Sequence, residues 1–220
     1  LSVTSGGAIT NTGALTIGGT ASFTTDVSDQ AITLSNTSNS FTGAVSLNTS
    51  GTSGDATLTS NNAVTLSTST VGGDLNVTVG GGNSLNATGA ATAGGSISLL
   101  ADDDIIFTAS GDLTTTTGNI TVTANNDSDS SGSGGALTMV DGTVFDAGTG
   151  TLALSADEDI TLGLLQTTSS SDAAVTLTST SGGAFDGDSD SSLDIDAADG
   201  RLVADLVTGF GTEFNAIETT

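Results

Sequence analysis

One short phrase recurs along the whole 220-residue chain: a small residue, followed by two apolar residues that flank a polar one. It occurs at Gly13–Ile17 (Gly-Ala-Leu-Thr-Ile), Gly43–Leu47, Gly73–Val77 and Gly118–Val122. Apolar residues at every second position predict short β-strands with one buried face. Clusters of Gly, Asn, Asp and Ser separate the phrases and are typical of turns. The sequence therefore predicts an all-β chain without long helices.

Many short strands fit either an antiparallel sandwich or barrel, or a parallel β-helix. The near-identical phrases favour the parallel β-helix, because stacked coils need interchangeable aliphatic residues. Hairpin-type Asp-Gly pairs are scarce and begin at Asp141, Asp186 and Asp199. With coils of roughly 20 residues, the chain would form about ten coils. We expect one continuous β-solenoid over residues 1–220, with an acid-poor half (1–100) and an acid-rich half (101–220).

The composition fits a narrow core. Hydrophobic residues make up 35% of the chain, and the aromatic residues are seven Phe with no Trp or Tyr. Small aliphatic side chains fill a thin interior better than a thick one. We expect the phenylalanines to lie in the core, at Phe23, Phe41, Phe107, Phe145, Phe185, Phe210 and Phe214.

The charge is strongly negative. The chain holds 25 acidic residues and a single base, Arg201, for a net charge of −24. Nucleic-acid binding needs Lys and Arg against the phosphates, so this class is excluded. Anionic membranes are also unfavourable partners, and no apolar run is long enough for membrane insertion. An extracellular setting, where cations screen the repulsion, fits the charge best.

Several segments resemble the repeats of very large bacterial exoproteins of the filamentous-haemagglutinin type. They are Leu1–Ile17, Ser69–Thr78, Ala156–Leu165 and Thr208–Thr220. The resemblance implies a right-handed parallel β-helix, secretion as a giant polypeptide, and work as an adhesin, stalk or matrix fibre. It implies a location outside the cell or on the bacterial surface. Because the chain opens at Leu1 in the middle of the alternating pattern, we expect it to be an excerpt of a larger repetitive protein. The implied partners are neighbouring solenoid repeats or identical subunits stacked head to tail, and glycans or the surface of a host or neighbouring cell.

Carboxylates are the only side chains that suggest a ligand. Asp102–Asp104 and Asp157–Asp159 each precede an expected strand and would lie at solenoid corners. Calcium takes several carboxylate and carbonyl oxygens, so clustered acids suit it. The predicted ligands are the dense group Asp186, Asp188, Asp190, Asp194 and Asp196, together with the loop residues Asp127 and Asp129. Asp194 and Asp196 flank Ile195 and are expected on the outer face. The alternative is a solvated acidic surface without a metal, and the fold requires no cofactor.

The chain lacks the groups on which most catalysis depends. It has no His, Lys or Cys to activate its many serines. The sequence therefore predicts a structural or adhesive shaft rather than an enzyme. Two alternatives stay open: a self-assembling filament subunit stacked end to end and stabilised by calcium, and a β-helix that binds or cleaves polysaccharide with paired carboxylates.

Overall fold

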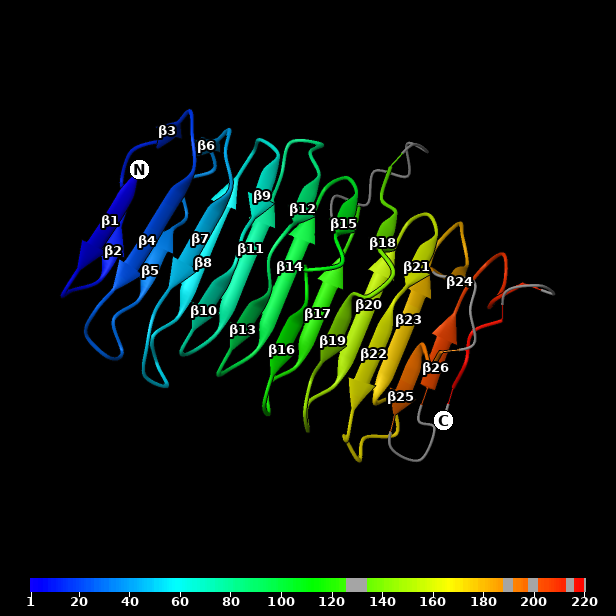
Figure 1. The fold of residues 1–220 in the computed structure, drawn as a ribbon. Coiled ribbons are helices and arrows are strands. Elements are labelled where there is room, and N and C mark those ends of the chain that lie inside the picture. The colour runs from blue at the N-terminus through cyan, green and yellow to red at the C-terminus, as the bar shows by residue number, and fades with distance from the viewer. Residues whose placement is uncertain (126–133, 188–191, 198–201, 213–215, 220) are drawn as a thin grey trace.

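The computed structural model describes residues 1–125, 134–187, 192–197, 202–212 and 216–219. In this part of the chain the backbone winds into a stack of coils, and strands of successive coils lie side by side in rows (Figure 1). Every strand pair of the described residues is parallel. The same residues contain no helix, and so none able to span a bilayer. The predicted all-β parallel solenoid is confirmed.

One face of the stack is a nine-stranded sheet with a strand from each coil. Its strands, in spatial and sequence order, are β2 (Ile9–Thr10), β5 (Ile32–Leu34), β8 (Ala56–Ser60), β11 (Leu75–Val79), β14 (Ile97–Ala101), β17 (Ile120–Thr123), β20 (Leu152–Ala156), β23 (Val175–Ser179) and β26 (Leu202–Asp205). Sequence order equals spatial order because each coil is laid directly on the one before it.

The remaining strands form a 15-stranded sheet and a two-stranded sheet. The large sheet begins with β1 (Ser2–Ser5), β4 (Ala21–Thr25) and β7 (Val45–Asn48). At β7 it divides into two rows. One row is β9 (Val64–Leu66), β12 (Leu85–Ala87), β15 (Ile105–Phe107), β18 (Leu137–Met139), β21 (Ile160–Leu162) and β24 (Ala184–Asp186). The other row is β10 (Ser69–Val71), β13 (Ala91–Ala93), β16 (Leu113–Thr115), β19 (Val144–Asp146), β22 (Leu164–Thr167) and β25 (Ile195–Ala197). The two-stranded sheet pairs β3 (Thr16–Ile17) with β6 (Ser40–Phe41).

The coils are longer and fewer than the sequence predicts. The nine-stranded sheet defines eight turns between Ile9 and Leu202, not ten. The shortest of these turns runs from Ala56 to Leu75, and the longest runs from Ile120 to Leu152. The strands span only two to five residues, so most of each coil lies in the corners, whose length the strand pattern does not constrain.

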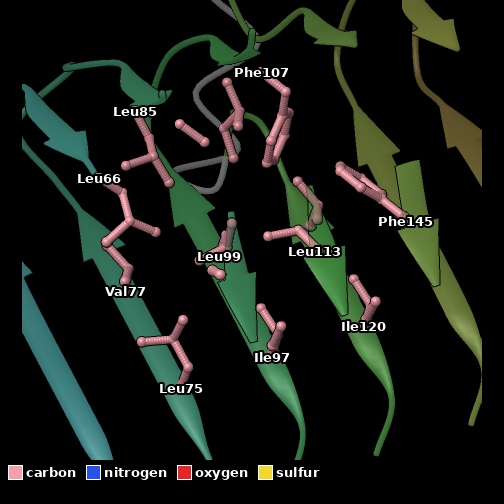
Figure 2. Close-up of a cluster of buried hydrophobic side chains, with 14 of the residues drawn as sticks. Leu66, Leu75, Val77, Leu85, Ile97, Leu99, Phe107, Leu113, Ile120 and Phe145 are labelled. Atoms are coloured by element: carbon pink, nitrogen blue, oxygen red, sulfur yellow. The ribbon is translucent and has the colours of Figure 1, made fainter. Parts of the chain in front are cut away.

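The core is a set of side-chain columns that run along the stack. In the nine-stranded sheet Leu58, Val77, Leu99 and Val122 occupy equivalent positions in four successive coils, and all four are fully buried. Figure 2 shows Val77 and Leu99 pointing into the same interior as Leu66, Leu85 and Leu113 of the opposing strands. Stacked aliphatic side chains thus form one continuous core.

The phenylalanine prediction is confirmed for part of the set. Phe23, Phe41, Phe107 and Phe145 are buried, and the rings of Phe107 and Phe145 meet edge to face with centroids 4.7 Å apart. Phe185 points outward from β24, and Phe210 is exposed. Those two belong to the last coils. Phe214 lies outside the described residues.

Candidate cation site

The structure describes three of the seven predicted metal ligands. Asp186, Asp194 and Asp196 belong to the described part of the chain, and their positions follow from β24 and β25. The other four predicted ligands, Asp127, Asp129, Asp188 and Asp190, lie outside the described residues.

Asp194 and Asp196 do not share a face, so that prediction is wrong. Asp196 is an outward residue of β25, whereas Asp194 precedes the strand and is only 3% exposed. The strict alternation begins at Ile195, where β25 begins. Asp194 lies in the corner before it, where the backbone turns and period-two spacing no longer decides orientation.

Asp186 closes β24 and points inward, with 6% of its surface exposed. Glu218 lies in the last coil, next to Thr219, which forms a parallel bridge with Ile195. Oxygen atoms of Asp186, Asp194 and Glu218 all lie within 4.8 Å of one another. We call these three residues the carboxylate cluster.

Main-chain hydrogen bonds fix the carboxylate cluster. The Asp194 carbonyl accepts the Leu165 N–H at 2.8 Å, so Asp194 is held to β22 of the preceding coil. On the other side the N–H groups of Asp194 and Ile195 donate to the Glu218 carbonyl, and the Glu218 N–H donates to Asp194 Oδ2 at 2.9 Å. The positions of Asp194 and Glu218 therefore follow from the parallel ladder.

Burial dominates the electrostatics of the carboxylate cluster. The pKa of Asp194 is raised to about 7, chiefly because burial removes its charge from water. The charge of Asp186, a side-chain hydrogen bond with Glu218 and the charge of Glu218 add to the rise in pKa, and the hydrogen bond from the Glu218 N–H opposes it. Glu218 Oε2 is enclosed and has no hydrogen-bond partner. The only base of the chain, Arg201, lies outside the described residues.

Three converging carboxylates can hold a hard cation. Calcium binds oxygen at about 2.3–2.6 Å, so oxygens on one ion lie within roughly 5 Å of one another. The 4.8 Å limit of the carboxylate cluster fits this spacing. Backbone carbonyls and water can complete the six to eight ligands that calcium takes.

Sequence reasoning found Asp186 and Asp194 but missed Glu218. The missing information was the coil length. Asp194 and Glu218 are 24 positions apart in the sequence, and the bridge from Ile195 to Thr219 shows that this separation is one full turn. The shorter coil expected from the sequence, roughly 20 residues, would instead align Phe214 with Asp194.

The acidic corners that the sequence also suggested for calcium accept hydrogen bonds from main-chain N–H groups. Asp104 Oδ1 accepts the N–H groups of Gly135 and Ala136, and Asp159 Oδ1 accepts the N–H of Gly183. Asp104 and Asp159 are two coils apart, and Ala136 stands between them in register. Their charges are therefore separated by an intervening coil and compensated by donors.

The outer face also carries a polar row. Asp146, Gln166 and Asp196 occupy equivalent positions on β19, β22 and β25. With Thr167 and Thr168 they line a shallow hollow of about 240 Å³. Asp146 also accepts the Gly148 N–H at 2.8 Å, which shows a role within the corner.

The parallel rungs, the continuous core and the repeated corners define a β-solenoid repeat protein. A family model described as repeats of unknown function (DUF5649) matches residues 1–48 and 53–114, half of the chain. The chain belongs to this family. None of the curated proteins and none of the solved structures matches it. The matched residues end in β16, and the carboxylate cluster lies beyond them.

Proposed function

We propose that this chain is a shaft or fibre segment of a bacterial extracellular or surface protein, with a structural or adhesive role and no catalysis. The observation that carries the proposal is the continuity of the described coils: one core and the nine-stranded parallel sheet run from the first of these coils to the last. The two termini lie at opposite ends of the stack (Figure 1). A polypeptide arranged in this way spans distance, and its length scales with its number of coils.

The exposed composition supports an extracellular setting. The outward positions of the strands are mostly Ser, Thr and Asn, as in Thr57, Asn76, Ser98 and Thr121, which follow one another in register. These polar side chains keep the surface of the rod hydrated, and the net charge of −24 makes separate rods repel one another. The likeness of several segments to filamentous-haemagglutinin-type repeats supports the adhesive role.

Small-angle X-ray scattering tests the shaft. Eight turns at roughly 4.8 Å each give a rod on the order of 40 Å along its axis. For a single shaft, this length should be the same at every protein concentration. A globular scattering profile would contradict the proposal.

Antibodies raised against the chain should label intact cells of the source organism, and labelling only after permeabilisation would contradict the surface location.

A second candidate function is a filament subunit that stacks end to end. It is favoured by the apolar side chains that the last coil exposes, since Val203, Val207 and Phe210 are 44%, 66% and 40% exposed. Leu202 is only partly buried, whereas its register partner Val175 in the coil beneath is fully buried. Sheet edges of this kind pair with further strands. Rods that lengthen with concentration in electron micrographs would support the filament over the single shaft.

A further inference from the structure

We propose that Asp186, Asp194 and Glu218 bind one calcium-class divalent cation, which fastens the last coil to the coil beneath it. This goes beyond the proposed shaft, which needs no ligand. The site joins three separate segments: the end of β24, the corner before β25, and the residues beside Thr219.

The first argument is the burial of like charge. Asp186 and Asp194 are almost completely withdrawn from water, and Glu218 is partly so. For comparison, Oδ1 of the half-buried Asp104 accepts two main-chain N–H groups. Asp194 Oδ2, which is buried more deeply, accepts the N–H of Glu218, a residue that itself brings a further carboxylate. Asp194 and Glu218 bring like charges together beside Asp186, with oxygens within 4.8 Å of one another. Such an arrangement at a largely buried place favours a bound proton or cation.

The second argument is the enclosed oxygen of Glu218. Glu218 Oε2 has essentially no contact with solvent and no hydrogen-bond partner. Among the described residues only Asn11 Oδ1 shares this condition, and it lies in the first coils. Buried acceptors in native proteins nearly always have a partner. Unlike Asn11 Oδ1, Glu218 Oε2 belongs to a residue whose carboxylate converges with two others, so it is available to a cation that all three could share.

The third argument concerns the kind of cation. The carboxylates come from backbone positions that the parallel ladder fixes, so the backbone cannot close around a small ion. Calcium accepts irregular oxygen geometry and variable coordination number, whereas magnesium demands near-ideal octahedral ligands at about 2.0–2.1 Å and keeps its water. The site should therefore prefer calcium to magnesium.

The experiment compares the chain in chelator, calcium chloride and magnesium chloride, at matched ionic strength with sodium chloride. Calorimetric titration should show one saturable calcium site. Calcium should raise the melting temperature and slow amide hydrogen exchange in residues 202–212 and 216–219, and magnesium should do so less.

The variant Glu218→Gln separates ligation from packing. It should weaken calcium binding at least tenfold, yet in chelator it should be no less stable than the parent chain, because it removes one of three repelling charges. Asp205→Asn is the matched control, since Asp205 is exposed on β26 of the same coil. It changes the charge equally and should keep the full calcium response.

Two outcomes would overturn the proposal. One is the absence of saturable binding, with stability following pH alone, which would mean that protons compensate the carboxylate cluster. The other is a calcium response of Glu218→Gln equal to that of Asp205→Asn, which would mean general screening of the acidic surface. Neither outcome affects the proposed shaft, because rod dimensions are measured independently.

Discussion

Single buried polar residues hold neighbouring coils in register. Asn39 is fully buried and contacts three coils. Its amide nitrogen donates to the carbonyls of Leu34 and Thr59, each at 3.1 Å, and its Oδ1 accepts the Leu15 N–H at 2.9 Å. Removal of the amide would leave all three main-chain groups without this partner, in surroundings that are buried or partly buried.

Asn39→Ala should lower the free energy of unfolding by about 2–4 kcal/mol, since several buried donors and acceptors lose partners at about 1–3 kcal/mol each and partial relaxation recovers some of that loss. Urea denaturation measures the change. Asn76→Ala is the control, because Asn76 faces outward on β11, and it should stay within about 0.5 kcal/mol of the parent. Equal effects of the two variants would contradict the role of Asn39.

Glycines permit the coils to approach at the corners. A Cβ at Gly118 would lie well inside van der Waals contact with the Gly95 carbonyl one coil below, and a Cβ at Gly150 would meet Gly118 in the same way. This column needs glycine because backbone from the neighbouring coil occupies the space.

Gly118→Ala should destabilise the chain by about 1–3 kcal/mol, the usual cost of overpacking. Gly7→Ala is the control, because a Cβ there meets nothing within 4 Å. The control should be neutral or slightly stabilising, since alanine reduces the entropy of the unfolded chain. Thermal melting of both variants decides the question, and a neutral Gly118→Ala would show that the corner can open.

At the scale of the strand, alternation separates core from surface. In β14 the burial pattern is strictly alternating: Leu99 is fully buried, whereas its neighbour Leu100 lies on the outer face. Parallel pairing places Leu99 between Val77 and Val122. A shift of one residue in register would exchange the two leucines.

Leu99→Ala should cost about 2–5 kcal/mol, the range for a buried leucine that leaves a cavity. Leu100→Ala removes the same atoms from the opposite face of the same strand and should cost below about 1 kcal/mol. Chemical denaturation of the pair tests the register directly. A larger effect at Leu100 would mean that the register is displaced by one residue.

The whole molecule is modular, because each coil contacts chiefly the coils before and after it. Leu75 and Ile97 are register partners one turn apart, so residues 75–96 form one complete coil. After their removal Ile97 follows Asp74 directly, and β14 can pair with β8 in the place of β11. Stability of a repeat stack is approximately a sum over coils and their interfaces.

Deletion of residues 75–96 should leave a folded rod that is shorter by roughly 4.8 Å, with a modestly lower melting temperature. Deletion of residues 75–85, half a coil, should unfold the stack or strongly destabilise it, because every later strand then meets the wrong face. Circular dichroism and X-ray scattering compare the two. Equal tolerance of both deletions would contradict the stacked-coil arrangement.

The local pattern predicted the strands well and the corners poorly. Leu47, Val77 and Val122 are buried as the repeated phrase predicts, because apolar residues at period two leave one choice of face. The corner residue Asp194 was placed outside, and Glu218 was not considered at all. Corners vary in length from coil to coil, so counting along the sequence does not show which residues of successive coils coincide.

By itself the sequence determined that the chain forms short strands with one aliphatic face buried, because apolar residues recur at every second position. The near-identical phrases favoured parallel stacking, since each can occupy the same position in successive coils. Only the tertiary structure decided the number of turns, the burial of Asp186 and Asp194, and the meeting of both with Glu218. The physical reason is range: strand alternation is a property of neighbouring residues, whereas the carboxylate cluster depends on the accumulated length of every corner between its members.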